Sequence, residues 1–278
     1  TGALVAPYFV DWTNYRADFE TAASKILGRE VRVSGKASAR LLPFPSVTFE
    51  NVRVGDDIEN PVMTIGKFSM DAELAPFLKG EVLIFDMRIE NPRVLVSIAE
   101  NGAVDWTLRP AAPSAVATVT LENVNITGGV IDIEDESAGK RVTVEAVNAR
   151  ISAKALTGPW RFDGSLEADG EKLAVSGSTG ALDADKKMSL RLSLNPVERS
   201  VVMETDGRVS LVNGAPLYLG DFVFRPALLT DPGAVALRDG EGALKGAPDK
   251  GPSFRVKGKF EARHGGVTFP SYRLETGT

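Results

Sequence analysis

The feature that most constrains the fold is an alternation of apolar and polar residues that continues along most of the chain. Successive side chains of a β-strand point to opposite faces of its sheet, so a period of two indicates strands with one apolar face. The strand candidates are residues 31–41, 47–54, 65–74, 82–89, 94–98, 121–126, 130–133, 142–153, 160–166, 173–176, 188–194, 201–203, 208–212, 254–262 and 267–274.

Turn-forming pairs separate these segments, among them Asn91-Pro92, Asp206-Gly207 and Asn213-Gly214. The alternation slips by one residue near Asn51, which is typical of a β-bulge or a strand break. Residues 226–253 have the poorest pattern and are rich in Gly, Pro and Asp, which predicts a long loop. With no second helix long enough for a crossover between parallel strands, the sequence predicts an antiparallel all-β architecture.

One segment has helical periodicity. Its apolar stripe recurs at three- and four-residue steps and consists of Tyr15, Phe19, Ala22, Ala23 and Ile26. Asp11 or Thr13 is the expected N-cap, and Gly28 is the expected end in the left-handed conformation. This amphipathic helix of about fifteen residues would be about 22 Å long, enough to close one end of a groove but not to cover a whole sheet.

The predicted fold is therefore all-β and mainly antiparallel: an elongated curled sheet or groove, or an incomplete barrel, with one N-terminal amphipathic α-helix. The apolar face of such a sheet has to be covered by a second layer, by closure, or by a ligand. A closed sandwich and an open groove occupied by lipid both satisfy this requirement, and periodicity alone does not choose between them.

Composition excludes several functional classes. The 278 residues include no cysteine and a single histidine, and the net charge is −5. Zinc–cysteine sites, iron–sulfur clusters and thiol catalysis are excluded, and the scattered Lys and Arg residues argue against a nucleic-acid partner. His264 is expected to be a solvated loop residue. No cofactor and no metal site is predicted.

The acidic clusters are interpreted as surface features. Residues 132–136 lack the Gly and the distal Glu of a calcium-binding loop, so a solvated hairpin end is the preferred interpretation. The pairs Asp56-Asp57 and Asp183/Asp185 are of the kind that glycosidases use, but both lie in turn-like contexts. We therefore expect that the chain is not an enzyme.

The first ten residues carry no charged side chain and are too short to cross a bilayer as a helix. We interpret residues 1–10 as the stump of a longer N-terminal membrane anchor; the alternative is a buried segment of a soluble domain. Tyr8, Trp12 and Arg16 would then lie at the membrane surface, because amphipathic aromatic residues favour that interface. The alternative role for Tyr8 and Trp12 is in the core at the end of the sheet.

Several motifs resemble one family in their order and spacing. They are FVDWTNYR at residues 9–16, LGREV at 27–31, LPFP at 42–45, PFLKG at 76–80, IENPRV at 89–94 and NGAVDW at 101–106. Together they resemble the N-terminal region of AsmA-like proteins, which are related to TamB and YhdP. A further match at residues 121–133 is less specific, and little after about residue 226 resembles the family.

The resemblance implies a single-pass protein of the bacterial inner membrane with its β-rich body in the periplasm of a Gram-negative envelope. It implies lipid transport and outer-membrane biogenesis, with phospholipid or another envelope lipid as ligand. The expected function is non-enzymatic binding or transfer of acyl chains along an apolar β-groove between the two membranes. The alternative is a structural or chaperone-like factor that assists outer-membrane protein assembly, with assembly proteins as partners and no lipid ligand.

The groove candidates follow from the alternation, since residues two apart on a strand share a face. They are Val82, Ile84, Val94, Val96, Ile98, Val142, Val144, Leu190, Leu192 and Leu194.

The expected organisation is an anchor at 1–10, a helix and β module at 11–110, a linker at 111–118, and a second β module at 119–278 that continues beyond residue 278. A weak repeat supports two modules, because residues 49–54 (FENVRV) are similar to residues 121–126 (LENVNI).

Overall fold

The fold was analysed in a computed structural model that describes residues 16–40, 44–73, 82–105, 119–183, 185, 187–228, 231 and 253–277. Within these residues the chain forms one helix and a single sheet of fifteen strands. The elements are α1 (Arg16–Leu27), β1 (Val31–Val33), β2 (Ala37–Arg40), β3 (Ser46–Val54), β4 (Met63–Ala72), β5 (Val82–Ile98), β6 (Val104–Asp105), β7 (Val119–Asp135), β8 (Lys140–Ala153), β9 (Trp160–Ala168), β10 (Glu171–Thr179), β11 (Met188–Pro196), β12 (Val201–Val212), β13 (Ala215–Pro226), β14 (Phe254–Arg263) and β15 (Gly266–Thr276).

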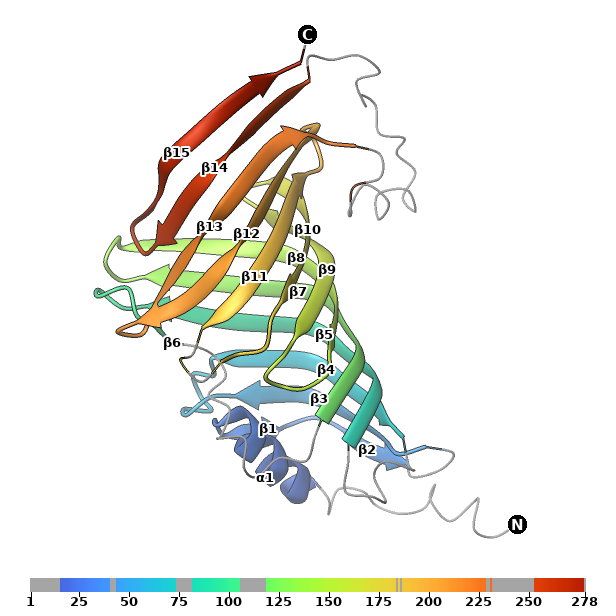
Figure 1. The fold of residues 1–278 in the computed structure, drawn as a ribbon. Helices are drawn as coiled ribbons and strands as arrows, with labels where there is room; N and C mark the ends of the chain where they lie inside the picture. The colour runs from blue at the N-terminus through green and yellow to red at the C-terminus, as the bar shows by residue number, and fades with distance from the viewer. Residues whose placement is uncertain are drawn as a thin grey trace.

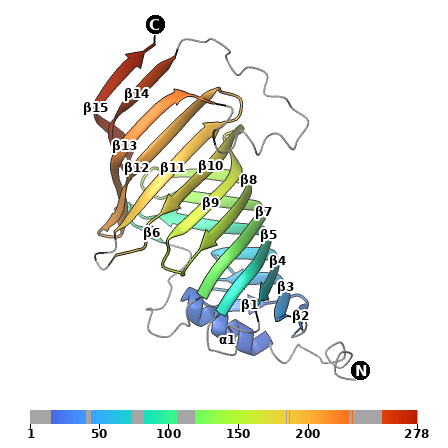
Figure 2. The ribbon, with the colours of Figure 1, turned by 45° about the vertical axis from the view of Figure 1, so that its right-hand side comes forward.

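The strands follow one another in nearly sequential order, from β1 and β3 at one end to β14 and β15 at the other, with β2 paired to β3 and β6 paired to β5. Neighbouring strands are antiparallel except β5 and β7, which run parallel from Val82 beside Val119 to Ile98 beside Asp135. The sheet curls without closing on itself, as Figures 1 and 2 show. The prediction of an all-β, mainly antiparallel, curled sheet with one N-terminal helix is confirmed.

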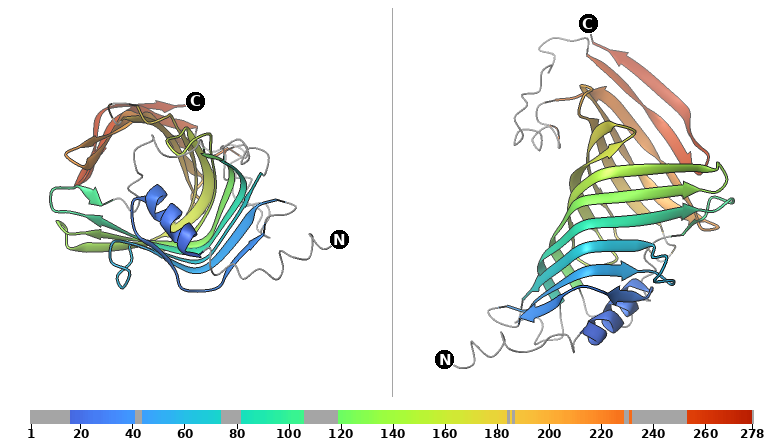
Figure 3. Two further views of the ribbon diagram at one scale, coloured as in Figure 1. Left: turned by 90° about the horizontal axis from the view of Figure 1, so that it is seen from below. Right: turned by 180° about the vertical axis from the view of Figure 1, so that it is seen from behind.

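Helix α1 lies at the lower mouth of the curl, inside the curve of the sheet (Figure 3). Phe19, Ala23 and Leu27 of the helix pack against a buried cluster that includes Val33 and Val52. Gly28 ends the helix with φ of 69°, as expected. The helix therefore closes one end of the curl and leaves most of the sheet uncovered by any second layer in the described residues.

The concave face of the sheet, called the inner face below, is apolar in both halves of the sheet. The first half consists of strands β1 to β8 and the second half of strands β9 to β15. In the first half one row crosses five strands: Val54, Met63, Val94, Ile131 and Val144. In the second half one row crosses six strands: Val175, Leu194, Met203, Phe224, Val256 and Leu274. Such rows arise when neighbouring alternating strands pair in register.

The convex face carries the polar halves of the same strands. Ion pairs join neighbouring strands there: Lys67 with Glu90, Arg93 with Asp132, Arg150 with Asp163, Arg191 with Asp206, and Lys257 with Glu275. Exposed pairs of this kind each contribute roughly 0.2–1 kcal/mol, so they support the register more than the stability.

A line of irregular backbone, called the bulge line below, crosses the first half of the sheet, and the pairing shifts register on it between β7 and β8 and between β8 and β9. Asn51 on β3, Asn91 on β5, Gly128 on β7 and Ala146 on β8 all have positive φ, between 48° and 64°. Inner-face residues are two positions apart along a regular strand, but at this line they are three positions apart, as from Phe49 to Val52. Each strand therefore keeps its apolar residues on the inner face on both sides of the line. Bulges bend strands and increase their twist, which accounts for the curl here.

Glycines on the inner face have a corresponding role in the second half. Gly207 of β12 lies directly opposite Gly220 of β13. A Cβ atom at Gly207 would lie 2.4 Å from the carbonyl oxygen of Leu219, so no larger residue fits without moving the backbone. Close backbone approach at strand glycines lets the sheet bend sharply between β12 and β14.

Several strand boundaries differ from the predictions. Asn91-Pro92 and Asp206-Gly207 were predicted as turns, yet β5 and β12 run straight through them, and the segments 121–126 and 130–133 likewise join as β7. Asn91 is left-handed and is not part of the regular pairing with β4, which lets the central strand β5 continue through Pro92. Strand β13 was not predicted. Helix α1 has twelve residues in the described part of the chain, and Tyr15 of the predicted apolar stripe lies outside that part. The expected N-caps, most of the predicted loop 226–253, and the segments 1–10 and 111–118 lie outside the described residues.

Candidate functional site

A cavity of about 450 Å³ opens on the inner face between the first and second halves of the sheet. Its volume lies within the range of about 300–1,000 Å³ that is typical of small-molecule sites. The lining residues come from the β5–β6 turn region and from β11 to β14: Ile98, Gly102, Val104, Leu190, Leu192, Leu194, Met203, Thr205, Val209, Pro216, Tyr218, Phe260, Ala262, Arg263 and His264. We call this cavity the chamber.

The chamber wall is mostly aliphatic and aromatic. Leu190, Leu192 and Leu194 alternate along β11 and form one side. The rings of Tyr218 and Phe260 form another side, with their centroids 4.9 Å apart. Such a lining favours hydrocarbon and offers few partners to a polar ligand.

Beyond the chamber, the apolar inner face continues to the last strand and is uncovered there. Phe269 of β15 contacts Phe222 and Phe260, and its side chain is 48% exposed. Tyr272 and Leu274 are 72% and 59% exposed. The chamber is thus the deepest part of an apolar surface that extends to the edge of the sheet.

The polar groups in the chamber wall largely satisfy one another. The hydroxyl of Tyr218 lies 3.0 Å from the carbonyl oxygen of Leu190, to which it donates, and 3.0 Å from Oγ1 of Thr205. Burial raises the pKa of the Tyr218 phenol above its usual value, so the ring stays neutral. The ionisable side chains that remain in the lining, Arg263 and His264, lie at the turn between β14 and β15.

The structure brings four of the predicted groove residues together in the chamber: Ile98, Leu190, Leu192 and Leu194. Val94, Val96, Val142 and Val144 lie elsewhere on the inner face. Val94 and Val96 of β5 are half-buried and continue through Ile131 and Ile133 to Val144 and Val142.

Ile84 is 5% exposed and belongs to a packed cluster with Val119, Leu121, Val124 and Ala153, away from the chamber. The side chain of Val82 lies outside the described set.

Sequence reasoning missed Tyr218, because β13 was not recognised. The alternation of Tyr218, Phe222 and Phe224 with residues of the other face was the available signal.

Of the predicted membrane-proximal residues, Tyr8 and Trp12 lie outside the described residues. Arg16 opens α1, and its Nη2 atom donates a hydrogen bond to the carbonyl oxygen of Gly35 at 3.0 Å. In the part of the chain that the structure describes, no helix combines the length and apolarity needed to span a bilayer.

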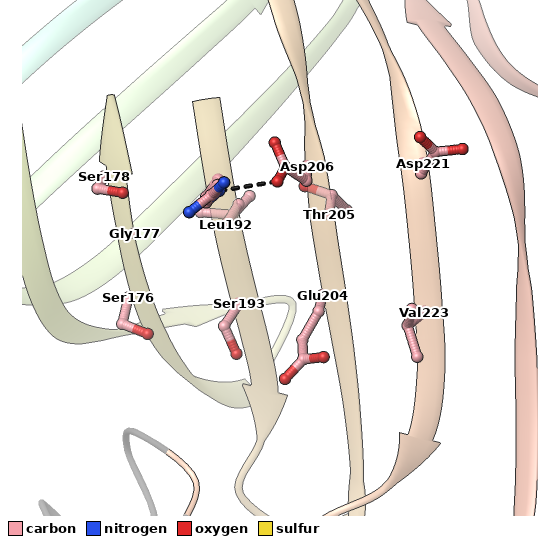
Figure 4. Close-up of a pocket in the computed structure, with 11 residues that line it drawn as sticks. Ser176, Gly177, Ser178, Leu192, Ser193, Glu204, Thr205, Asp206, Asp221 and Val223 are labelled. Atoms are coloured by element: carbon pink, nitrogen blue, oxygen red, sulfur yellow. Dashed lines mark hydrogen bonds and ion pairs between the residues drawn. The ribbon is translucent and has the colours of Figure 1, made fainter. Parts of the chain in front are cut away.

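The convex face has a polar hollow of about 390 Å³ over β10 to β13, shown in Figure 4. Asp206 accepts a hydrogen bond from Arg191 at 2.8 Å, and Glu204 is held by Arg225 at 2.5 Å. Asp221 lies opposite Asp206 on the next strand. Two of these three carboxylates are therefore committed to ion pairs along the sheet.

The acid pairs considered from sequence are also occupied by structural contacts. Asp56 forms an ion pair with Arg29 at 2.9 Å. The side chain of Asn60 donates to Asp57 and lowers the pKa of that carboxyl, whereas a general acid needs a raised pKa. Residues 132–135 of the acidic run end strand β7 and Glu136 begins the turn to β8, so the run lies at a hairpin end, as predicted. No group of three or more His, Cys, Asp or Glu that could hold a metal ion occurs among the described residues.

His264 differs from its predicted state. It lies in the turn between β14 and β15, as predicted, but it is not freely solvated: its side chain is 21% exposed, and Nε2 lies 3.1 Å from Oδ2 of Asp135 and 3.1 Å from Oγ of Ser137. These partners come from the turn between β7 and β8, so the contact spans two distant parts of the sheet. The spacing of 129 residues between His264 and Asp135 leaves no local sequence signal for it.

Comparisons with protein-family models, with curated proteins and with solved structures gave no match. The class of protein defined by the described residues is therefore structural: a single unclosed, curled β-sheet with an apolar concave face and one helix at its mouth.

Proposed function

We propose that this protein binds the acyl chain of a phospholipid or another envelope lipid in the chamber and passes it along the inner face. The observation that carries this proposal is the apolar inner face, hollowed at Leu190, Leu192 and Leu194. A soluble protein with a large exposed apolar surface needs a partner or ligand to cover it. Each methylene group that an acyl chain buries would contribute about 0.8 kcal/mol.

The cellular setting of the proposal rests on the sequence motifs. The resemblance to AsmA-like proteins supports an inner-membrane anchor, a periplasmic body and transfer toward the outer membrane. The absence of a catalytic role is part of the same proposal. The curled sheet is compatible with such a role, because its apolar inner face continues from the chamber to β15, where Tyr272 and Leu274 are exposed.

The direct test is native mass spectrometry of the purified protein, with lipid extraction of the same sample. We expect co-purified phospholipid or a lipid of similar chain length in the wild-type protein. Leu192→Glu places a carboxylate in the chamber wall and should abolish lipid binding, since an acyl chain cannot offset the desolvation of a charge.

Ser189→Glu is the matched control, because Ser189 is an exposed residue of the same strand on the opposite face. It should retain lipid. Wild-type protein that carries no lipid after gentle purification, and takes up none from vesicles, would contradict the proposal and favour the chaperone-like alternative. That alternative needs an edge strand free to pair, whereas β15 carries Pro270, which has no N–H to donate.

A further inference from the structure

The curled sheet meets itself along one side of the chamber through hairpin turns. The N–H of Val104, beside the β5–β6 turn, donates to the carbonyl oxygen of Gly214 in the β12–β13 turn at 3.2 Å. His264 in the β14–β15 turn reaches Asp135 and Ser137 at the β7–β8 turn, each at 3.1 Å. We call this contact zone the seam.

The seam differs from every other wall of the chamber. Neighbouring strands elsewhere are joined by continuous ladders, such as the one between β12 and β13 from Val201 beside Pro226 to Val212 beside Ala215. Across the seam no strand pairing is present in the described residues. The seam consists of turns, which are the parts of a sheet that open at lowest cost.

The seam also borders the chamber directly. Gly102, Val104 and His264 line the chamber and belong to the seam at the same time. Gly102 packs against His264 so closely that a Cβ atom there would lie 2.7 Å from the His264 Cβ. Separation of these turns would expose the leucine side of the chamber without breaking a ladder.

We propose that the seam is a lateral gate of the chamber, held shut by the contact of His264 with Asp135 and closed more tightly when His264 is protonated. The regulatory role rests on the proposed lipid-binding function, but the opening itself does not. A gate at this position would admit a hydrocarbon chain sideways, so the chain would not have to pass the end closed by α1.

The charges around the imidazole favour this direction of pH dependence. Asp135 faces Nε2, and hydrogen bonds from Ser137 and from the Ala138 N–H help to lower the pKa of Asp135, so its carboxylate stays ionised near neutral pH. Arg263, beside His264, is paired with Glu261, and Glu134 is paired with Arg141. Glu100 and Glu136, on the two neighbouring turns, are exposed. An imidazolium would therefore gain attraction mainly from Asp135.

The gate can be tested without lipid, because the chain has no cysteine of its own. Leu192→Cys places one thiol in the chamber, and Thr157→Cys, at an exposed loop position, provides the reference for intrinsic reactivity. The maleimide labelling rate of the Leu192→Cys protein is divided by that of the Thr157→Cys protein. This ratio should be about two- to fivefold lower at pH 5.5 than at pH 8, which is the factor expected of a partly exposed ion pair.

His264→Gln should raise this ratio and remove its pH dependence, whereas Lys172→Gln, at an exposed position of β10 outside the chamber lining, should change neither. Equal ratios in the wild type and in His264→Gln, with both proteins folded, would overturn the gate whatever the protein binds.

A second measurement connects the gate to the ligand. Ser137→Cys combined with His264→Cys allows a short bismaleimide to lock the seam, and uptake of a fluorescent fatty acid is then followed in time. Locking should slow uptake at least threefold and leave the final amount bound unchanged. An unchanged uptake rate would overturn the gate, while absence of uptake in the unlocked wild type would contradict only the proposed lipid function.

Discussion

The ring of Phe19 on α1 stacks on the ring of Phe49 on β3, with the centroids 3.9 Å apart and the planes at 25°. Phe68 of β4 lies beside both rings, at 6.1 Å and 6.4 Å. This aromatic group joins the helix to the first strands of the inner face, next to the buried residues Val33 and Val52. The end of the curl is therefore closed by side-chain packing, with the helix as part of the core.

Phe19→Asp should destabilise the protein by about 3–5 kcal/mol, because it removes a large packed ring and places a charge against apolar residues. Denaturant unfolding followed by circular dichroism measures the change. Ala22→Asp is the control on the same helix, since Ala22 is exposed, and it should cost less than about 1 kcal/mol. Equal effects of the two substitutions would mean that the helix is not docked on the sheet.

The bulge line makes a second prediction. Ala146 has φ of 48°, a conformation that costs an L-residue about 1–2 kcal/mol and costs glycine almost nothing. Ala146→Gly should therefore stabilise the protein by up to about 1 kcal/mol in equilibrium unfolding. Ala149→Gly, three residues further along β8 and without positive φ, should destabilise it by about 0.5–1 kcal/mol. If both substitutions destabilise, Ala146 is not strained.

The sequence predicted the strands and their apolar face because alternation is a local property. It predicted turns at Asn91-Pro92 and Asp206-Gly207 because these residue types are common in turns. In the sheet, Asn91 is a left-handed residue of the bulge line, whereas Gly207 lies in a regularly paired part of β12, opposite Gly220. What decides between a turn and a continuous strand is the partner strand, which no local pattern contains. The motif E-N-x-R-V occurs at residues 50–54 and 90–94, and both asparagines are left-handed bulge residues, so this recurrence was the available signal for the bulge line.

The chamber was only partly predictable. Leu190, Leu192 and Leu194 follow from alternation on β11, but their meeting with Ile98 depends on how far the sheet curls. The curl is set by bulges and by glycine pairs such as Gly207 and Gly220, whose effect accumulates over many strands. The seam at His264 is a consequence of the same accumulation, so no local sequence pattern indicates it.

Asp231 provides a pH-dependent test of a buried ion pair. Both of its oxygens accept hydrogen bonds from Arg225, at 2.7 Å and 2.8 Å, and these bonds lower the pKa of Asp231. A carboxyl whose pKa is lower in the folded state contributes stability above its unfolded value of about 3.9, and loses it as pH falls through the folded value. Asp231→Asn should thus cost about 1.5–3 kcal/mol at pH 7, and less at pH 2.5.

Urea unfolding of both proteins at the two pH values measures this difference. Asp185→Asn is the control, because Asp185 is exposed and lies 3.9 Å from Lys187, and it should change the stability at neither pH. A cost of Asp231→Asn that is the same at pH 7 and pH 2.5 would show that the ion pair does not contribute.

The last prediction compares two residues of β5 that both lie on the inner face. Ile84 is buried in a packed cluster, whereas Val96 is half-buried, two residues before Ile98 in the chamber wall. Ile84→Glu should destabilise the fold by several kcal/mol, roughly the cost of burying an unpaired carboxylate among apolar side chains. At Val96 the carboxylate would face the open part of the inner face, where water can reach it.

Val96→Glu should therefore leave the melting temperature nearly unchanged and remove the bound lipid, since a chain that gains about 0.8 kcal/mol per buried methylene cannot displace the hydration of the charge. Melting temperature and lipid content, measured on the same preparations, separate the two cases. Unfolding of both variants would mean that the whole inner face is a closed core. A folded Val96→Glu protein with unchanged lipid would place the ligand elsewhere, and the transfer path along β5 would be wrong.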